Sequence, residues 1–554
     1  MEHAMRARTL PLLLLATLPI ACGTTGHPDS AGAPQPRKAE SASLPSIAMP
    51  SPQPAAMPSA ALARIAQPAP AMQPSASDRE QYQPIERHGV LRVAETPVST
   101  FSIDVDTGSY TNLRRLLRAG QLPPRDAIRV EELVNYFPYA YPLPKDNTPF
   151  AVSTEVAPTP WNRNSLLLRI GIQAADPAKE TLPPANLVFL VDVSGSMSTA
   201  DKLPLLKQAM KRFVAELRPQ DRLSLVTYSG RTQVVLEPTA GDRKAQMIAA
   251  IDGLQAAGAT AGGAGIELAY TLAQQGFLKD GINRVLLATD GDFNVGITRF
   301  ETLKDLVAER RKLGISLTTL GFGTGNYNDQ LMEQLADAGD GAYRYIDNLN
   351  EAQKVLVDEF SSTLATVAHD VKIQLEFNPA VVSEYRQIGF ENRALRREDF
   401  SNDKVDAGEI GAGHRVTALY EITLAGTPGR LEPLRYAAAE TARSKAGELA
   451  FLRLRYKPAH GEDSRLLEVP LRRADIRQDK GSEDFRFAAA VAAFGQRLSD
   501  GGRYLNDFGF NDIASLARAS RGEDPYGYRG EFLGLVRLAE GLAATQPQPE
   551  TERD

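Results

Sequence analysis

One carboxylate and two hydroxyl side chains follow a strongly apolar segment of the chain at a spacing that suits cation binding. Asp192, Ser194 and Ser196 occupy alternate positions of a short loop that contains Gly195 and directly follows the apolar run 187–191. Such a run is typical of a strand that is buried on both faces. Open α/β sheets bind their ligands at the carboxyl ends of these strands. Oxygen donors of this kind suit Mg²⁺ and similar hard cations, and they suit zinc or copper poorly.

Two residues further along the chain extend this group of oxygen donors. Thr260 lies in the Gly/Ala-rich stretch 258–263, and Asp290 follows a second apolar run, 285–289, and precedes Gly291. A polar loop that only caps the next helix is the plainer alternative for the first motif. Three motifs in this order, each at a predicted strand or loop junction, favour a metal site instead.

The DxSxS loop, the Thr in a Gly-rich loop and the later TDG resemble the motifs of the von Willebrand factor A domain. That family uses these positions as a metal-ion-dependent adhesion site. The resemblance implies a divalent cation, with Mg²⁺ expected first and Mn²⁺ or Ca²⁺ as alternatives. Its site residues in this chain would be Asp192, Ser194, Ser196, Thr260 and Asp290.

The same resemblance implies roles for these residues. Ser194 and Ser196 would be direct ligands of the cation, and Thr260 would become a ligand when a partner binds. Asp192 and Asp290 would hold the cation directly or through water. An open coordination position would then accept an Asp or Glu carboxylate from a protein partner.

The elements around these motifs alternate between apolar runs and amphipathic patterns. This alternation predicts an α/β fold, a doubly wound and mostly parallel sheet of the von Willebrand A type over residues 184–350. Strands are expected at 187–191, 223–228, 232–236, 285–289, 315–320 and 343–346, and helices at 203–217, 247–254, 266–278, 301–313 and 330–336.

Two other Asp-rich motifs are rejected as sites. One matches four positions of an EF-hand calcium loop, but the residues before it are strand-like and Val295 stands where that loop requires glycine. The other, 103–108, resembles the nucleophile motif of haloacid-dehalogenase-like phosphatases, but Gly108 stands where that motif has Thr, so we expect a turn there. The members of the first motif are Asp290, Asp292, Asn294 and Glu301.

The beginning of the chain predicts export and membrane anchoring. Residues 1–22 contain an apolar stretch that is too short to span a bilayer, followed by Cys22, the only cysteine. This arrangement resembles a bacterial lipobox, although Pro19 stands where Leu is usual, and ordinary signal cleavage is the alternative. Residues 23–85 are rich in Pro, Ala and Ser, which predicts a disordered tether. We therefore expect a lipid anchor in the bacterial cell envelope, facing the periplasm or the cell surface.

Three regions flank the predicted A domain. Residues 86–183 form an N-terminal α+β segment, 365–475 a β-sandwich-like domain, and 480–545 a helical region. The alternating strands of the sandwich predict one face in solvent. Strands on both sides of the A domain suggest that it is inserted into the sandwich. The segments 101–110 and 522–529 resemble those of the YfbK-like family of bacterial envelope proteins.

Composition narrows the range of functions. With 62 basic and 68 acidic residues, the net charge is −6, and no long basic run favours a nucleic-acid partner. The six histidines form no recognisable catalytic pair, and no Walker loop or G-x-S-x-G elbow occurs, so no enzyme is expected. We expect metal-dependent protein recognition or adhesion. Two alternatives stay open: a structural envelope protein whose metal only stabilises it, and a metal-dependent hydrolase.

Overall fold

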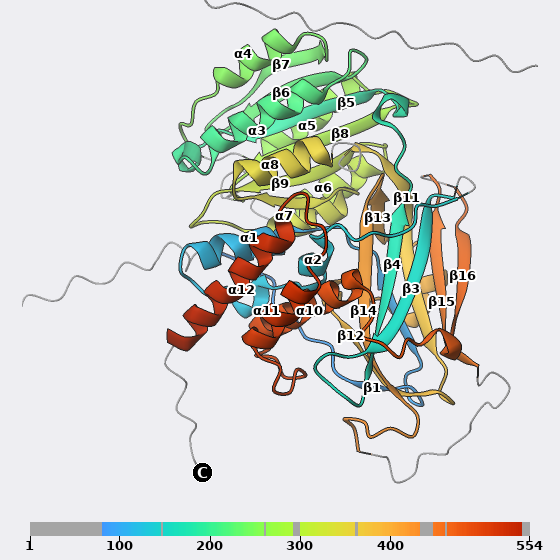
Figure 1. Ribbon diagram of the computed structural model, residues 1–554. Coiled ribbons are helices and arrows are strands. Elements are labelled where there is room, and N and C mark those ends of the chain that lie inside the picture. Colours follow the sequence, from blue (N-terminus) through green and yellow to red (C-terminus); the bar gives the residue numbers. More distant parts are fainter. Residues whose placement is uncertain are drawn as a thin grey trace, which may run out of the picture. The chain divides into compact units, whose positions relative to one another are not determined.

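The computed structural model describes most of the chain from residue 80, so it includes the last six residues of the predicted tether. These residues are ordered against the folded part: the backbone N–H of Gln81 donates to the Tyr327 carbonyl at 3.0 Å, and Glu80 pairs with Arg115 at 2.8 Å. The expected signal, Cys22 and Thr260 lie outside the described residues. The described residues belong to one compact unit, residues 72–554, which contains three sheets and their covering helices (Figure 1). Within this part of the chain, no helix has the length and apolar character needed to cross a membrane. The described ranges are 80–145, 148–259, 262–291, 300–359, 364–432, 447–459 and 462–545.

A six-stranded sheet with the order β10-β9-β8-β5-β6-β7 forms the A domain. All neighbouring strands are parallel except β6 and β7, which are antiparallel. The expected α/β, doubly wound and mostly parallel sheet is therefore confirmed. Its strands are β5 (Ala185–Asp192), β6 (Arg222–Tyr228), β7 (Thr232–Ala240), β8 (Ile282–Thr289), β9 (Ser316–Phe322) and β10 (Tyr343–Ile346), and its helices are α3 (Leu203–Glu216), α4 (Lys244–Asp252), α5 (Gly262–Gln275), α6 (Phe300–Arg311), α7 (Asp329–Ala338) and α8 (Leu349–Gln353).

Strand β5 is buried along its whole length because helices cover both faces of the sheet. Successive side chains of a strand point to opposite faces. Leu187 and Phe189 pack in the core that includes residues of α3 and α4. Val188 and Leu190 pack in the core that includes residues of α5, α6 and α7. This double coverage explains the uninterrupted apolar run before the DxSxS loop.

Two antiparallel sheets share strands from both sides of the A domain in the chain. Strand β4 pairs with β14, and β2 pairs with β11, so segments before and after the six-stranded sheet lie in the same two sheets. The facing sides of these sheets enclose one apolar core. The strands are β1 (Leu91–Arg92), β2 (Val98–Ser102), β3 (Phe150–Pro158), β4 (Leu166–Ala174), β11 (Thr366–Phe377), β12 (Val382–Ile388), β13 (Gly408–Gly411), β14 (Arg415–Leu424), β15 (Glu448–Lys457) and β16 (Arg465–Arg472).

The expectation of a solvated outer face is wrong for the sheet that contains β4. Leu168 and Ile170 point into the sandwich core, but Leu167 packs into a separate core with Phe487 and other helical residues. Helices from distant parts of the chain dock on this face, and α2 packs against both β14 and α10. These helices are α1 (Gly108–Arg118), α2 (Val130–Asn135), α10 (Glu483–Ser499), α11 (Phe510–Ala519) and α12 (Tyr528–Thr545).

Short helical turns connect the longer elements. One of them, η4 (Gly195–Ser198), contains the second hydroxyl of the DxSxS loop, and the π-helical turn η5 (Lys354–Asp358) continues α8. The remaining turns are η2 (Arg125–Ala127), η3 (Lys179–Thr181), η6 (Glu391–Arg393), η7 (Arg397–Ser401) and η9 (Arg473–Asp475).

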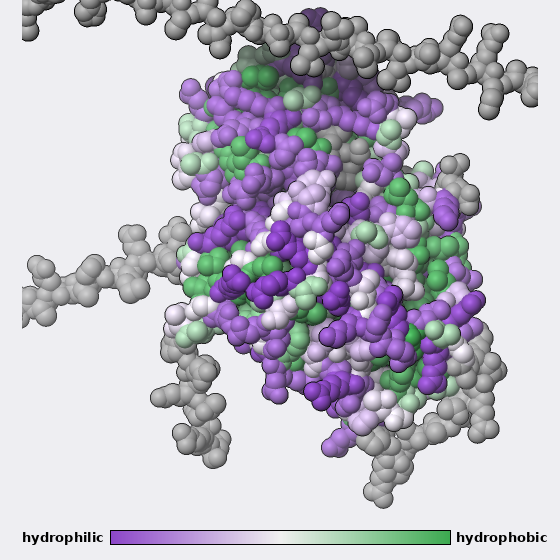
Figure 2. Space-filling model, in the orientation of Figure 1, coloured by the Kyte–Doolittle hydropathy of each residue, from purple (hydrophilic) through white to green (hydrophobic). Residues whose placement is uncertain are grey.

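The face of the molecule in Figure 2 is mainly hydrophilic, with hydrophobic residues in small separate groups. Large apolar side chains that are exposed include Leu143, Leu313, Leu466 and Tyr526, which lie far apart in the sequence. Scattered apolar residues of this kind are normal on a soluble surface and do not by themselves mark a docking site.

Candidate functional site

The end of β5 and the end of β8 lie side by side at one edge of the A-domain sheet. These strands are parallel neighbours, with Val191 paired to Ala288. Asp192 is the last residue of β5, and Asp290 directly follows β8. The pairing therefore brings both carboxylates to the same edge, where α/β sheets bind ligands. Both side chains are buried.

Asp192 is held in place by its own loop and by the neighbouring strand. Its Oδ1 atom accepts a hydrogen bond of 2.8 Å from the backbone N–H of Ser194, and its Oδ2 atom accepts one of 3.0 Å from the Thr289 hydroxyl. Burial raises the pKa of Asp192 to about 6, an effect that the hydrogen bonds from Ser194 oppose and the charge of Asp290 reinforces. The carboxylate thus occupies one fixed orientation.

The two serine hydroxyls of the loop lie next to each other. Ser194 Oγ and Ser196 Oγ are 3.0 Å apart, and Ser194 is buried whereas Ser196 is exposed. The backbone N–H of Gly195 donates to the carbonyl of Gly258 at 2.9 Å, which joins this loop to the segment that leads to Thr260. Thr260 itself lies outside the described residues, so its part in the site stays a prediction.

Gly291 follows Asp290 in a backbone conformation that favours glycine. Its φ is +83°, and a Cβ atom there would lie only 2.8 Å from the backbone nitrogen of Asn328. Its own N–H donates to Thr289 Oγ at 3.1 Å. The glycine of the TDG motif therefore allows the tight turn that places Asp290. The residues before Asp290 form a strand, which agrees with rejection of the EF-hand alternative.

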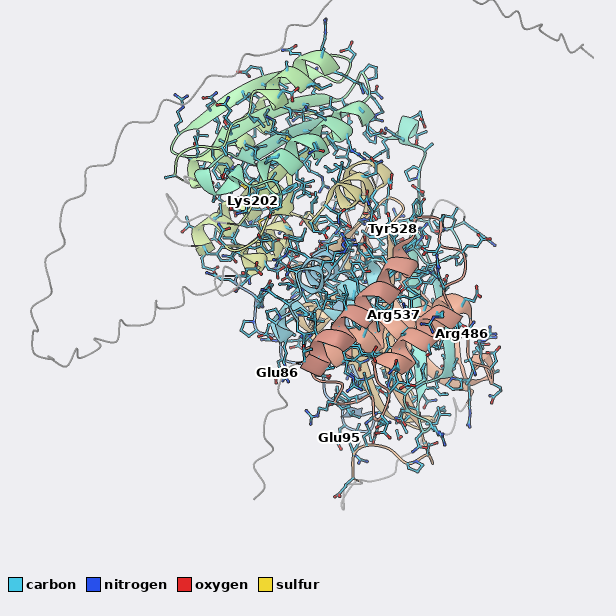
Figure 3. The ribbon with its side chains drawn as sticks, turned by 60° about the vertical axis from the view of Figure 1, so that its left-hand side comes forward. Glu86, Glu95, Lys202, Arg486, Tyr528 and Arg537 are labelled. Carbon is cyan, nitrogen blue, oxygen red and sulfur yellow. The ribbon has the colours of Figure 1, made fainter. Side chains whose placement is uncertain are left out.

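Lys202, just before α3, places a cation in this group of residues. Its Nζ atom donates to Asp290 Oδ2 and to Asn326 Oδ1, each at 2.9 Å (Lys202 is labelled in Figure 3). Asn326 Nδ2 also donates to Asp290 Oδ2, at 3.1 Å. The Lys202 side chain is only 5% exposed. No sequence signal singles out Lys202 or Asn326, because a lysine at the start of a helix is ordinarily solvated.

The donors at this edge of the sheet fit a hard divalent cation. The described members are two carboxylates and two hydroxyls, whereas zinc and copper favour imidazole or thiolate ligands. The ammonium of Lys202 neutralises part of the charge on Asp290. A cation held here would therefore keep much of its own positive charge and would attract an external carboxylate.

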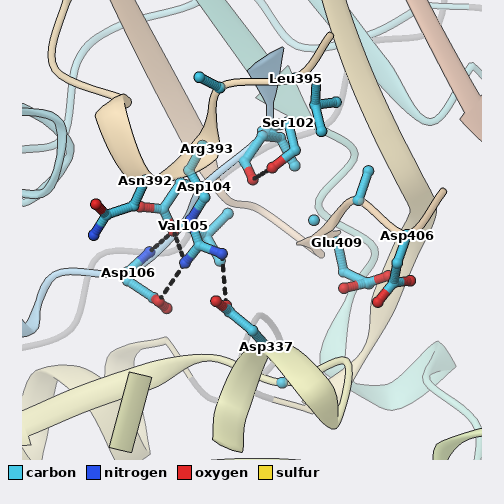
Figure 4. A pocket seen from close by; sticks show the side chains of 15 residues that line it. Ser102, Asp104, Val105, Asp106, Asp337, Asn392, Arg393, Leu395, Asp406 and Glu409 are labelled. Carbon is cyan, nitrogen blue, oxygen red and sulfur yellow. Dashed lines mark hydrogen bonds and ion pairs between the residues drawn. The ribbon is translucent and has the colours of Figure 1, made fainter. Parts of the chain in front are cut away.

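The Asp-rich turn at 103–108 lies at a different place, in a cavity beside Arg393 (Figure 4). The Arg393 guanidinium is 3.2 Å from both Asp104 Oδ1 and Asp106 Oδ2, and 2.7 Å from Asp337 Oδ1. These acidic residues thus have an arginine partner that joins the turn to α7. This pairing agrees with rejection of the phosphatase alternative.

Three family profiles match the chain in consecutive regions. The profile described as "von Willebrand factor type A domain" matches residues 186–358, which contain the six-stranded sheet. One described as "von Willebrand factor" matches residues 76–169. A third, described as "Uncharacterized protein YfbK, C-terminal", matches residues 362–542.

Among solved structures, the chain is similar to a von Willebrand factor type A protein from Catenulispora acidiphila. The TM-score is 0.40 with 16% sequence identity, over 69% of this chain and 88% of that chain. The PilB minor pilin from Streptococcus sanguinis also matches, with a TM-score of 0.27 and 15% identity, over 38% of this chain and 76% of that chain.

The chain is also similar to several proteins in sequence. The human inter-alpha-trypsin inhibitor heavy chain H4 is 30% identical over 38% of this chain and 23% of that protein. Protein sll0103 of Synechocystis sp. is 31% identical over 41% of this chain and 54% of that protein. YfbK of Escherichia coli is 50% identical over 471 residues, which are 83% of this chain and 81% of YfbK. Because this identity extends over most of both proteins, the chain belongs to the YfbK-like family of von Willebrand factor type A domain proteins.

Proposed function

We propose that this protein is a metal-dependent protein-recognition module of the bacterial cell envelope. A divalent cation, with Mg²⁺ expected first, would be held by Asp192, Ser194, Ser196, Thr260 and Asp290. The observation that carries the proposal is the pair of serine hydroxyls, 3.0 Å apart in the loop that directly follows the buried and fixed Asp192. When bound, the cation supplies a positive coordination position for an Asp or Glu of the partner.

Each described residue has a task in this proposal. The backbone N–H of Ser194 and the hydroxyl of Thr289 hold the Asp192 carboxylate, so little reorganisation is needed before a cation binds. Exposure of Ser196 leaves the group accessible to a macromolecule. Lys202 limits the negative charge of the site, which favours capture of an anionic side chain by the bound cation.

Location in the envelope rests on the first part of the chain. Lipidation of Cys22 and the composition of residues 23–79 would place the folded part, which begins by residue 80, at the end of a flexible tether. The partner would then be another envelope protein that presents a carboxylate. Loss of anchoring in a Cys22→Ala protein, measured by membrane fractionation of cells, tests this part of the proposal.

Partner capture from an envelope extract tests the recognition itself. We expect the wild-type protein to retain a partner in Mg²⁺ and to release it in chelator, because the cation provides the contact. A Ser194→Ala/Ser196→Ala protein should retain none, since both hydroxyl donors are removed while the backbone N–H that holds Asp192 remains. Ser198→Ala, in the same exposed turn, is the matched control and should behave as wild type.

The outcomes separate this function from a purely stabilising metal. Equal capture by the wild-type and double-variant proteins, or capture that persists in chelator, would contradict recognition through this site. A rise in melting temperature with Mg²⁺ and no metal-dependent partner would instead support the structural role.

A further inference from the structure

A second group of metal-ligating side chains lies at the opposite edge of the A-domain sheet. Asp340 follows α7 and precedes the amino end of β10, whereas Asp192 lies at the carboxyl end of β5. Two sandwich residues, His369 on β11 and Glu409 on β13, meet Asp340 there. One ligand atom of each of the three side chains lies within 4.8 Å of those of the other two. The group therefore draws on three separate segments and joins the A domain to the sandwich.

A bulge in β11 directs His369 toward this group. Strand β11 contains one extra residue relative to both neighbours here: its pairing shifts between Ala368 and Val371 against β13, and between His369 and Lys372 against β15. Asp370, inside the bulge, has a φ of +50°. Such bulges change the direction of side chains and are frequent next to functional sites.

Glu409 is the member of this group that most needs a cation. Its side chain is 12% exposed, and within the described part of the chain its one ion-pair partner is His369, whose Nδ1 atom lies 3.9 Å from Glu409 Oε1. Burying an ionised carboxylate without a counter-ion is costly. A bound cation would remove this cost directly.

Further acidic side chains surround Glu409. Burial, followed by the charges of Asp340, Asp406 and Asp370, raises the pKa of Glu409 well above its usual value. Among the described residues, the cations nearby pair with these other acidic residues and not with Glu409: Arg311 pairs with both Asp340 and Asp406, and Lys457 pairs with Asp370. Arg284, which also faces the group from β8, donates to Thr318 Oγ and the carbonyl of Leu364.

A cavity of about 210 Å³ opens beside the group and provides access for an ion. Asp406 and Glu409 form part of its wall, and Figure 4 shows their carboxylates next to each other. The Asp-rich turn at 103–108 also lines this cavity. Its lining is strongly acidic, with Arg393 as the cationic residue among the lining side chains, so it favours cations over anions.

The donor types identify the class of cation. One imidazole nitrogen and two carboxylates are ligands that Zn²⁺ and other first-row divalent metals accept, whereas Mg²⁺ and Ca²⁺ bind oxygen. Two metal–ligand bonds of about 2.1 Å can join atoms up to about 4.2 Å apart. The 3.9 Å between His369 and Glu409 already lies within this span.

We propose that Asp340, His369 and Glu409 bind a divalent transition-metal ion of the Zn²⁺ class and thereby fasten the A domain to the sandwich. This site is separate from the oxygen-donor site at Asp192 and Asp290 in both its position and its ligand chemistry. Because its ligands come from both parts, bound Zn²⁺ stabilises their contact and raises the melting temperature of the whole protein.

Zinc content of the full chain tests the proposal. After incubation with Zn²⁺ and dialysis, plasma mass spectrometry should find one more equivalent of zinc in wild-type protein than in His369→Gln or Glu409→Gln. Zn²⁺ should also raise the melting temperature of wild-type protein and not of these variants. The Ser194→Ala/Ser196→Ala protein and His88→Gln, at a histidine outside the group, should both retain the zinc.

Equal zinc content in the wild-type, His369→Gln and Glu409→Gln proteins would overturn the proposal, as would loss of this zinc from the serine variant. A Co²⁺ titration of the wild-type protein gives a check that needs no variant. Visible absorption typical of imidazole-bound Co²⁺ would support the site, and the spectrum of aqueous Co²⁺ alone would contradict it.

Discussion

Replacing Lys202 by methionine removes the cation that pairs with Asp290 and keeps most of the side-chain volume. The two charged atoms are 2.9 Å apart, with side-chain exposures of 5% and 0%. Removing one partner of a buried ion pair typically costs about 3–5 kcal/mol. Asn326 still donates to the same carboxylate oxygen. We therefore expect the free energy of unfolding to fall by about 3 kcal/mol, the lower end of this range, in the absence of divalent cations.

The same substitution should strengthen Mg²⁺ binding. Lys202 and a bound cation would share Asp290, so the ammonium repels the cation. At an effective dielectric constant of 20, two unit charges 4 Å apart interact by about 4 kcal/mol, so an ammonium and a doubly charged Mg²⁺ repel each other by about 8 kcal/mol. If about a sixth of this repulsion remains after solvent and ion screening, Mg²⁺ affinity rises about tenfold when Lys202 is removed. Saturating Mg²⁺ should then restore much of the stability lost by Lys202→Met.

Urea unfolding with and without Mg²⁺, together with calorimetric titration of Mg²⁺, measures both effects. Lys211→Met is the matched control because Lys211 lies on α3, the helix that begins directly after Lys202, and pairs with Asp252 at the surface. Exposed pairs contribute about 1 kcal/mol or less, so this control should change neither quantity much. Unchanged or weaker Mg²⁺ binding by Lys202→Met would refute the idea that the lysine and the cation share Asp290.

Three other predictions follow from single residues. Burial raises the pKa of Asp192 from 3.8 to about 6, so the stability that protonated Asp192 contributes to metal-free protein is present below pH ~4 and is lost as pH rises through ~6. Because a cation binds the ionised carboxylate, Mg²⁺ affinity should fall as pH drops through ~6, which calorimetry can follow. Gly291→Ala should lower the free energy of unfolding by about 1–3 kcal/mol in urea unfolding, and by more than Gly426→Ala. Both glycines have a positive φ, but only at position 291 would the added Cβ atom lie within 3 Å of a backbone atom. Arg114→Met should cost about 3–5 kcal/mol, since it leaves Glu351, 2.8 Å away and buried, without this partner; a loss below about 1 kcal/mol would contradict that reasoning.

The A-domain fold could be predicted from the sequence because its signals are local. The apolar runs before Asp192 and Asp290 are strands with helices on both faces, so uninterrupted apolar residues sufficed to identify them. Burial of Leu167 could not be predicted in the same way. Its face of the sandwich is covered by helices from far along the chain, and a strand pattern does not reveal what docks on it.

The candidate sites also differ in how far apart their residues lie in the sequence. Asp192, Ser194 and Ser196 lie within one loop, so their spacing alone indicates that their side chains converge. Lys202 reaches Asp290 only through the packing of α3 against the sheet, and nothing in its neighbouring residues indicates this contact. The group of Asp340, His369 and Glu409 depends on a bulge and on three separate segments. Such groups require tertiary structure to be recognised.

Calorimetric titration of Mg²⁺ tests directly whether the Asp192 loop binds a cation. Calorimetric titration of Mg²⁺ should detect one site in the wild-type and Ser198→Ala proteins, and this site should be lost or weakened at least about tenfold in Ser194→Ala/Ser196→Ala, a change of about 1.4 kcal/mol. Equal Mg²⁺ affinity in all three proteins would contradict a cation site built on the Asp192 loop.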